Sequence, residues 1–232
     1  MKKLHLLALV ALIMLGLSGC EKAKTVNQAW ADAFVKTIKN SQGATVYSVI
    51  HTVFSFNGMK SVSVTSPGGT VLQLANYQNG GVSFFNEPAD ADYLSTPPAA
   101  GNFTYTVKFN DGEEIVYTNT LSTENLLPAN ITSVVKTTKG DSVYIYWDAI
   151  ANVDAYGIAV NRGTTQAFKI DGLSDPSDPK KTSLRYGFTF SELTSGFSGI
   201  YTFEISGFLI EKIDPDYTYL QAKCSSKKDL TL

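Results

Sequence analysis

The sequence is poor in the residues from which most catalytic and metal-binding sites are built. It holds two histidines and two cysteines in 232 residues. His5 lies in an N-terminal segment with the composition of a cleavable leader, which leaves His51 alone in the rest of the chain. These numbers of histidines and cysteines are too small for a zinc site built from several histidines or a Cys-x-x-Cys pair. A Ser-His-Asp triad would need His51, which sits in an alternating strand pattern, so we interpret it as a strand residue facing solvent or a neighbour.

Concentrated basic segments and long apolar runs are also missing. The formal net charge is −2, with charges of both signs spread along the chain. Nucleic-acid binding requires a concentrated basic face, so nucleic acid is not an expected partner. No glycine-rich phosphate loop follows a strand and opens a helix. The apolar run Leu6 to Leu17 is too short to span a bilayer, which takes about 20 residues in a helix.

The N-terminus has the three regions of a signal peptide over residues 1–19. Lys2 and Lys3 precede the apolar run, and charged residues follow it at once. The segment Leu17-Ser18-Gly19-Cys20 resembles the lipobox of bacterial lipoproteins. The resemblance implies that Cys20 becomes a lipid-bearing N-terminus, with residues 20–25 as a tether, and Glu21 suggests the outer membrane. The alternative is an ordinary signal peptide with an incidental cysteine. Which face of the membrane the protein occupies stays open.

Cys224 is the single cysteine left once Cys20 carries lipid, so no intrachain disulfide is possible. We expect Cys224 to be a small apolar residue on a C-terminal strand. A reactive or intermolecular thiol is the alternative.

The remaining chain predicts an all-β fold of two Ig-like antiparallel β-sandwich domains in tandem. Aromatic residues, Thr, Ser and Val are abundant, and long helical patterns are missing. Residues 26–125 and 129–232 are each long enough to bury a core, and Leu126-Leu127-Pro128-Ala129 marks the boundary.

One short N-terminal helix is expected over residues 26–41. Thr25 and Gln28 form a capping-box pattern, and Gly43 supplies a stop. Large apolar residues recur at every fourth position, as Trp30, Phe34 and Ile38. The helix would cover an open end or edge of the first sheet; binding a partner is the alternative.

The period changes to two after residue 44. A long strand follows to Phe56, apolar on both faces, and Asn57-Gly58 predicts a tight turn. The strongest hairpin pairs 103–109 with 114–121 around Asn110-Asp111-Gly112.

Residues 129–232 resemble a fibronectin type III domain. The resemblance rests on spaced alternations rather than one motif: Val143-x-Ile145-x-Trp147, Tyr156-x-Ile158-x-Val160 and Tyr201-x-Phe203-x-Ile205. It implies one core between two sheets. The stretch Lys169–Lys181 is longer than this family needs. Domains of this kind host many functions, so the resemblance implies none by itself.

Four tyrosines are candidate ligand-binding residues. Tyr144 and Tyr146 alternate with core positions and should point outward, where two rings could form a flat platform for sugars. Tyr217 and Tyr219 repeat the pattern near the C-terminus. The alternative is cross-strand pairing on a solvated face, which contributes about 0.2–1 kcal/mol per pair.

Two acidic loops could offer oxygen ligands to calcium: Asp171, Asp175 and Asp178 in one, and Glu87, Asp90 and Asp92 in the other. Both lack the spacing of an EF-hand loop, and Asp before Pro is ordinary turn chemistry. We therefore predict no metal site and no cofactor, although calcium at residues 171–178 stays open. No pair of carboxylates is placed as glycoside hydrolysis requires.

These features favour a non-catalytic, membrane-anchored binding or adhesion module for a glycan or protein at the cell envelope. The whole chain is similar to two-domain surface lipoproteins of glycan-harvesting Gram-negative bacteria. The alternative is a structural spacer or a subunit of an envelope assembly, and a more remote one is a glycan-active enzyme. The expected partners are the membrane, through lipid on Cys20, and a glycan or envelope protein.

Overall fold

The computed structural model describes residues 26–77, 80–137, 142–174, 183–189 and 199–231, and these are almost entirely β-structure. The largest sheet is built from the strands β1 (Trp30–Lys39), β2 (Thr45–Phe54), β5 (Ala75–Asn76), β6 (Ser83–Asn86), β11 (Ala155–Arg162), β12 (Thr165–Ser174), β14 (Ile200–Ile213) and β15 (Thr218–Thr231). Its eight strands run in the order β12-β11-β14-β15-β1-β2-β6-β5.

Two smaller sheets accompany the large one. The three-stranded sheet has the order β13-β10-β9, formed by Ser183–Thr189, Ser142–Asp148 and Ile131–Lys136. The four-stranded sheet has the order β4-β3-β7-β8, formed by Val71–Gln73, Met59–Thr65, Gly101–Phe109 and Glu114–Leu121. The described residues contain one helical turn, η1 (Asp90–Asp92). Within these ranges no helix has the length and apolarity needed to cross a membrane.

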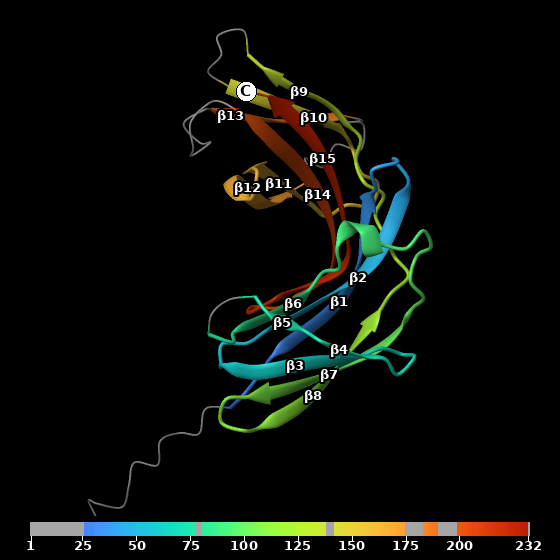
Figure 1. The fold of residues 1–232 in the computed structure, drawn as a ribbon, viewed down its shortest axis with the longest axis vertical. Coiled ribbons are helices and arrows are strands. Elements are labelled where there is room, and N and C mark those ends of the chain that lie inside the picture. The colour runs from blue at the N-terminus through green and yellow to red at the C-terminus, as the bar shows by residue number, and fades with distance from the viewer. Residues whose placement is uncertain (1–25, 78–79, 138–141, 175–182, 190–198, 232) are drawn as a thin grey trace, which may run out of the picture.

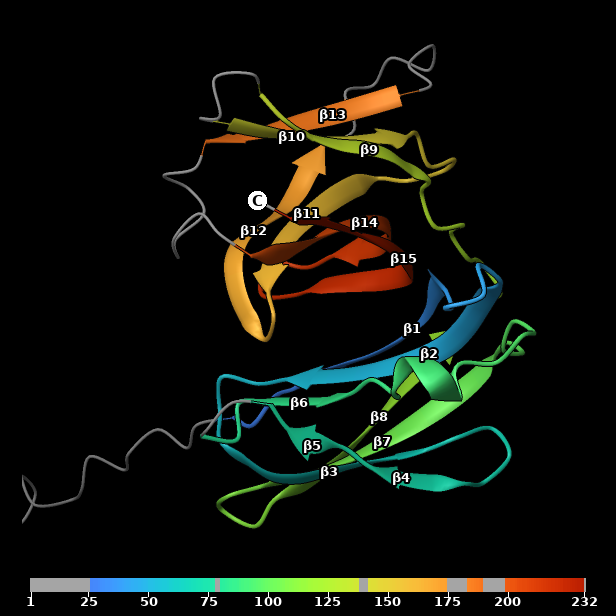
Figure 2. The ribbon, with the colours of Figure 1, turned by 45° about the horizontal axis from the view of Figure 1, so that its top comes forward.

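The eight-stranded sheet bends back on itself, and each small sheet covers one half of its outer face. Figure 2 shows four layers: the three-stranded sheet, the β12-β11-β14-β15 half, the β1-β2-β6-β5 half and the four-stranded sheet. Each outer layer encloses a separate hydrophobic core with the half beside it. The opposite face, which we call the inner face, lies on the inside of the bend (Figure 1). These sheets confirm the predicted all-β class with two Ig-like sandwiches.

The predicted N-terminal helix is wrong: Trp30–Lys39 is strand β1. A spacing of four fits a helical stripe, but it is also a multiple of the two-residue period of a strand. Trp30, Phe34 and Ile38 therefore share one strand face. The intervening residues Ala31, Ala33 and Val35 are also buried, in the core beneath the four-stranded sheet. Burial on both faces is typical of a central strand.

Strand β1 joins the two halves of the molecule. It pairs antiparallel with β2 and parallel with the C-terminal strand β15, with Val35 opposite Ala222 and Thr37 opposite Cys224. This is the one parallel pair among the described strands, in a fold expected to be antiparallel throughout. The domain boundaries stay predictions, but the two sandwiches share one continuous sheet.

The end of the β14–β15 hairpin folds over the inner face of β1 and β2. Register shifts beside Ile210 interrupt the β14–β15 ladder, and such bulges bend a strand. Beyond them, the Tyr217 ring stacks on Phe54, with ring centroids 6.3 Å apart. The hairpin thus covers one of the two apolar faces that the sequence indicated for this strand.

Other local predictions are confirmed. The strongest predicted hairpin is the β7–β8 pair, and the chain turns at Asn57-Gly58 between β2 and β3. The six C-terminal residues Trp147, Tyr156, Ile158, Tyr201, Phe203 and Ile205 lie in one core. Cys224 is fully buried beside them on β15. Burial raises the pKa of its thiol to about 11, so it packs as a small apolar residue.

Candidate functional site

The inner face carries a group of charged side chains at its centre, where β1 meets β15. Lys36 and Lys223 lie side by side in the parallel register. Their chain neighbours Val35 and Ala222 point the other way, into the two cores, so strand alternation directs both lysines to the inner face. Lys36 is almost completely buried there, which is rare for a lysine without a partner.

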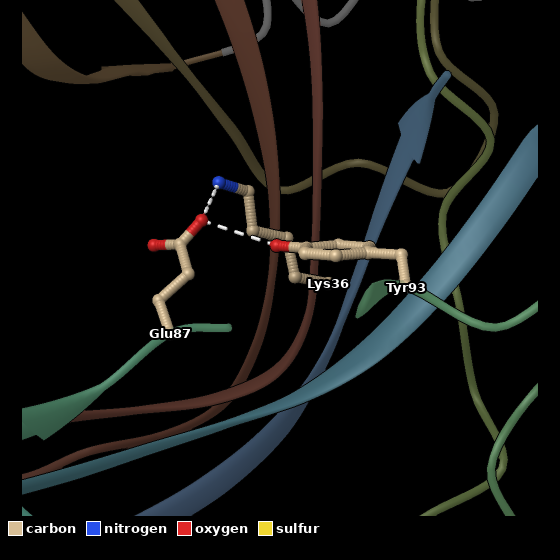
Figure 3. A network of polar contacts seen from close by, with 3 residues as sticks. All are labelled: Lys36, Glu87 and Tyr93. Carbon is tan, nitrogen blue, oxygen red and sulfur yellow. Dashed lines mark hydrogen bonds and ion pairs between the residues drawn. The ribbon is translucent and has the colours of Figure 1, made fainter. Parts of the chain in front are cut away.

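Glu87 supplies that partner (Figure 3). Glu87 directly follows strand β6, and its carboxylate forms an ion pair with the Lys36 ammonium. The Tyr93 hydroxyl donates a hydrogen bond to the same Glu87 oxygen, at 3.1 Å. Burial by itself would raise the pKa of Glu87, but the hydrogen bond and charge of Lys36 outweigh it and hold the pKa below its usual value. The pKa of Tyr93 is raised by burial and by the Glu87 charge. The Glu87 carboxylate thus has two partners, Lys36 and the protonated Tyr93 hydroxyl.

Lys223 differs from Lys36. Its ammonium lies over the Phe208 ring, 5.4 Å from the ring centroid. Among the described residues no ion pair includes it. Burial lowers the pKa of Lys223, and the like charge of Lys36 lowers it further.

A polar pocket of about 180 Å³ opens beside Lys223 on the inner face. Four adjacent strands, β12, β11, β14 and β15, supply its lining. The polar side chains that reach it include Asn161, Gln166, Glu204 and Ser206. Ammonium, carboxylate, amide and hydroxyl groups therefore converge on one small space, which suits recognition of a polar ligand.

The single histidine of the fold belongs to the core rather than to a pocket. The Nδ1 atom of His51 lies 2.9 Å from the Tyr105 hydroxyl, which donates to the backbone oxygen of Asp32. Burial lowers the pKa of His51 to about 4, so the ring is neutral at physiological pH. This agrees with the interpretation of His51 as a strand residue beside a neighbour.

Tyr144 and Tyr146 point away from the core, as the alternation predicted. They lie on the outer face of the three-stranded sheet, with ring centroids 6.4 Å apart. Tyr144 stands opposite Gly187, and its ring fills the space where a side chain at that position would lie. The Arg185 guanidinium is 5.8 Å from the centroid of the same ring. The result is an outward face of two rings and one cation, which we call the tyrosine face.

Tyr217 and Tyr219 lie elsewhere, at the end of the β14–β15 hairpin. The Tyr217 hydroxyl is 2.5 Å from the Thr52 hydroxyl, and its ring covers Phe54. Tyr219 contacts Tyr217 edge to face, and the Lys212 ammonium lies 5.5 Å from its ring centroid. The structure therefore does not bring the four tyrosines together.

The acidic residues of the two candidate calcium loops are not grouped into a metal site either. Asp171 forms an ion pair with Lys169 and Glu87 forms one with Lys36, while Asp175 and Asp178 lie outside the described residues. In the part of the chain that the structure describes, no three His, Cys, Asp or Glu side chains are grouped so as to hold a metal ion. The predicted signal peptide, Cys20 and the predicted tether also lie outside the described residues.

Alternation along the sequence placed the tyrosine face, but it could not place the inner-face pocket. The pocket combines residues as distant as Gly157 and Lys223. Only the register of four strands brings them together. The one local signal was a lysine, Lys223, in the middle of an otherwise apolar and small-residue strand segment.

No protein-family model and no curated protein matches the chain. Among solved structures, a candidate carbohydrate-binding protein from Bacteroides uniformis is 11% identical, with 87% of this chain and 99% of that chain covered and a TM-score of 0.31. A tetra-tandem repeat from the extending region of a large adhesion protein is 14% identical over 88% of this chain and 50% of that one, with a TM-score of 0.29. A cytokine receptor complex is 13% identical over 78% and 90%, also with a TM-score of 0.29. Similarity at this level carries no argument about a ligand.

Proposed function

We propose that the protein is a non-catalytic binding module of the cell envelope, anchored through lipid on Cys20, which holds a glycan on the tyrosine face. The observation that supports this most is the outward pair Tyr144 and Tyr146, whose ring planes are tilted by 37° to each other. Aromatic rings offer sugars a large apolar surface at little cost in conformational entropy. Arg185 beside them adds a hydrogen-bond donor for hydroxyl or carboxylate groups.

The surroundings of His51 and Glu87 support a non-catalytic role. His51 is buried in the core and hydrogen-bonded to Tyr105, and the Glu87 carboxylate forms an ion pair with Lys36. A general base must reach a proton on a substrate, and neither group is placed to do so.

The test is a glycan-array screen of the soluble chain that starts at residue 21. We expect saturable binding that is weakened about tenfold or more in a Tyr144→Ala/Tyr146→Ala variant, because aromatic contacts are worth about 0.5–1.5 kcal/mol each. Tyr77→Ala is the matched control, since Tyr77 is 70% exposed but lies beside Phe85, away from the tyrosine face.

Binding that survives in the double variant would contradict the assignment of the site. Absence of binding to every glycan would favour a protein partner or a spacer in an envelope assembly. The anchor is tested separately by cell fractionation: Cys20→Ser should leave the membrane fraction, because acyl chains hold a protein by about 0.8 kcal/mol per buried CH₂.

A further inference from the structure

The lysines of the inner face differ in whether a carboxylate forms an ion pair with the ammonium group. Lys36 is paired with Glu87, and Lys169 is paired with Asp171 at 2.8 Å. Lys223 lies against an aromatic ring instead, and within the described ranges no carboxylate comes within ion-pair distance of it. Glu204, Glu87 and Asp171 act on its charge without direct contact and offset only part of the effect of burial, since the pKa of Lys223 stays lowered. An anionic group in direct contact with the ammonium would therefore be favourable.

The pocket next to Lys223 has room for such a group because its floor is built from small residues. On β11, Gly157 and Ala159 lie opposite Ser206 and Glu204 of β14. A Cβ atom at Gly157 would come within 2.5 Å of the Asp171 carboxylate and 2.9 Å of the Phe208 ring. Glycine at this position allows the surrounding side chains to close in while the space in front of Ala159 stays open.

The lining favours a ligand that carries hydroxyl groups together with one negative charge. Glu204 can accept hydrogen bonds from hydroxyls, and the amides of Asn161 and Gln166 can both donate and accept. Asp171 and Lys169 of the lining pair with each other, so Glu204 and Lys223 remain, and the Glu204 charge opposes a compact, multiply charged anion such as phosphate. A volume of about 180 Å³ is below that of pockets for drug-sized ligands, roughly 300–1,000 Å³, so it suits a single sugar unit.

We propose that this inner-face pocket binds one acidic sugar unit, with the sugar carboxylate paired to the Lys223 ammonium and its hydroxyls held by Glu204, Asn161 and Gln166. The site is separate from the tyrosine face, which belongs to the three-stranded sheet. It therefore stands or falls independently of the glycan site proposed there.

Isothermal titration calorimetry at low salt tests the proposal, with digalacturonate as the probe and its dimethyl ester as the matched neutral ligand. We expect the acid to bind at least tenfold more tightly than the ester, because the ester cannot pair with Lys223. Lys223→Met keeps the side-chain length and its contact with Phe208, and it should weaken acid binding roughly ten- to hundredfold. Lys60→Met is the control, since Lys60 is an exposed lysine on β3 of the four-stranded sheet, and it should change affinity less than threefold.

A second variant separates pocket binding from general attraction between charges. Ala159→Leu keeps every charge but fills the pocket, and it should also abolish acid binding. Thermal unfolding of each variant, followed by circular dichroism, establishes that it is folded. Equal affinities for acid and ester, unchanged binding in Lys223→Met, or no saturation at millimolar digalacturonate would each overturn the proposal. Loss of acid binding in Tyr144→Ala/Tyr146→Ala with Lys223→Met unaffected would assign the acidic sugar to the tyrosine face instead.

Discussion

Asp32 is a carboxyl group that the fold removes completely from water. Its oxygens accept hydrogen bonds from the Leu220 backbone N–H, at 2.8 Å, and from the Asn119 amide, at 3.4 Å. Burial outweighs these bonds and raises the pKa of Asp32 to about 7. Asp32 thus ties the start of β15 to β1, but its ionised form lowers the stability of the folded state because it is buried.

The buried Asp32 carboxyl therefore makes the free energy of unfolding depend on pH, in a direction that can be stated. In the unfolded chain the pKa of Asp32 is near 3.8, so between about pH 4 and pH 7 the folded state binds the proton more tightly. The free energy of unfolding therefore falls as the pH rises through this range, by an amount on the order of a few kcal/mol. Asp32→Asn should remove this decline, because an amide still accepts the Leu220 N–H and never ionises.

Urea unfolding at pH 4, 5, 6 and 7 checks the prediction. The variant should gain stability relative to the natural protein as the pH approaches 7. His51 acts in the opposite direction: its pKa is lowered to about 4, so its contribution to stability is present above about pH 6.5 and is lost as the pH falls through 4. Because both proteins keep His51, its effect cancels in the comparison. Parallel pH profiles would show that Asp32 does not titrate in this range.

Residue orientation was the part of the candidate sites that the sequence predicted best. Alternation with Val143, Ile145 and Trp147 sufficed to turn Tyr144 and Tyr146 outward. It could not show that Tyr217 would reach Thr52, 165 residues away along the chain. Contacts of that kind depend on how strands bend after they pair.

Strand β1 shows the limit of periodicity at the scale of an element. Apolar residues four positions apart satisfy both a helix and a strand. The alanines between them, Ala31 and Ala33, favour helix by propensity, yet they pack in the core beneath the four-stranded sheet. Tertiary pairing on both edges, with β2 and β15, decides the conformation. By contrast, the β7–β8 hairpin was predictable because its alternation and its Asn-Asp-Gly turn agree locally.

The contacts at the bent end of the β14–β15 hairpin lead to a prediction about stability. Tyr217→Ala removes the ring that covers Phe54 and the hydroxyl that meets Thr52. We expect the free energy of unfolding to fall by about 1–3 kcal/mol, the range for losing a partly buried aromatic side chain. Tyr219→Ala, two residues further along the chain, is the matched control and should have a smaller effect, because the described residues offer Tyr219 no such hydrogen bond. Chemical denaturation of the two variants measures the difference. Equal losses would mean that the hairpin end is not held by Tyr217.

The shared sheet is the feature of the whole molecule from which the rest follows. The sequence predicted two sandwiches but gave no sign of a connection between them, since the pairing partners of β1 and β15 lie at opposite ends of the chain. That pairing places Lys36 beside Lys223, at the middle of a sheet whose inner face lies on the inside of the bend (Figure 1). The inner-face pocket itself is lined by the β12-β11-β14-β15 half alone, and the shared sheet sets Lys36 of β1 next to its Lys223.

The chain contains two tryptophans, and they report on the two halves separately. Trp30 lies on β1 beneath the N-terminal sandwich, and Trp147 lies in the C-terminal core. Trp147→Phe leaves Trp30 as the one fluorescent reporter, and Trp30→Phe leaves Trp147. In each variant, tryptophan fluorescence can be compared with far-ultraviolet circular dichroism, which follows the β-structure of the whole chain.

Equilibrium unfolding of these two variants is the most direct test of the shared sheet. The structure predicts that fluorescence and circular dichroism give the same midpoint and the same slope in each variant, because neither half can unfold without breaking the β1–β15 pairing. Two separated transitions, one followed by Trp30 and the other by Trp147, would contradict this result. The protein would then be two independent sandwiches, and the inner face would not be a single surface.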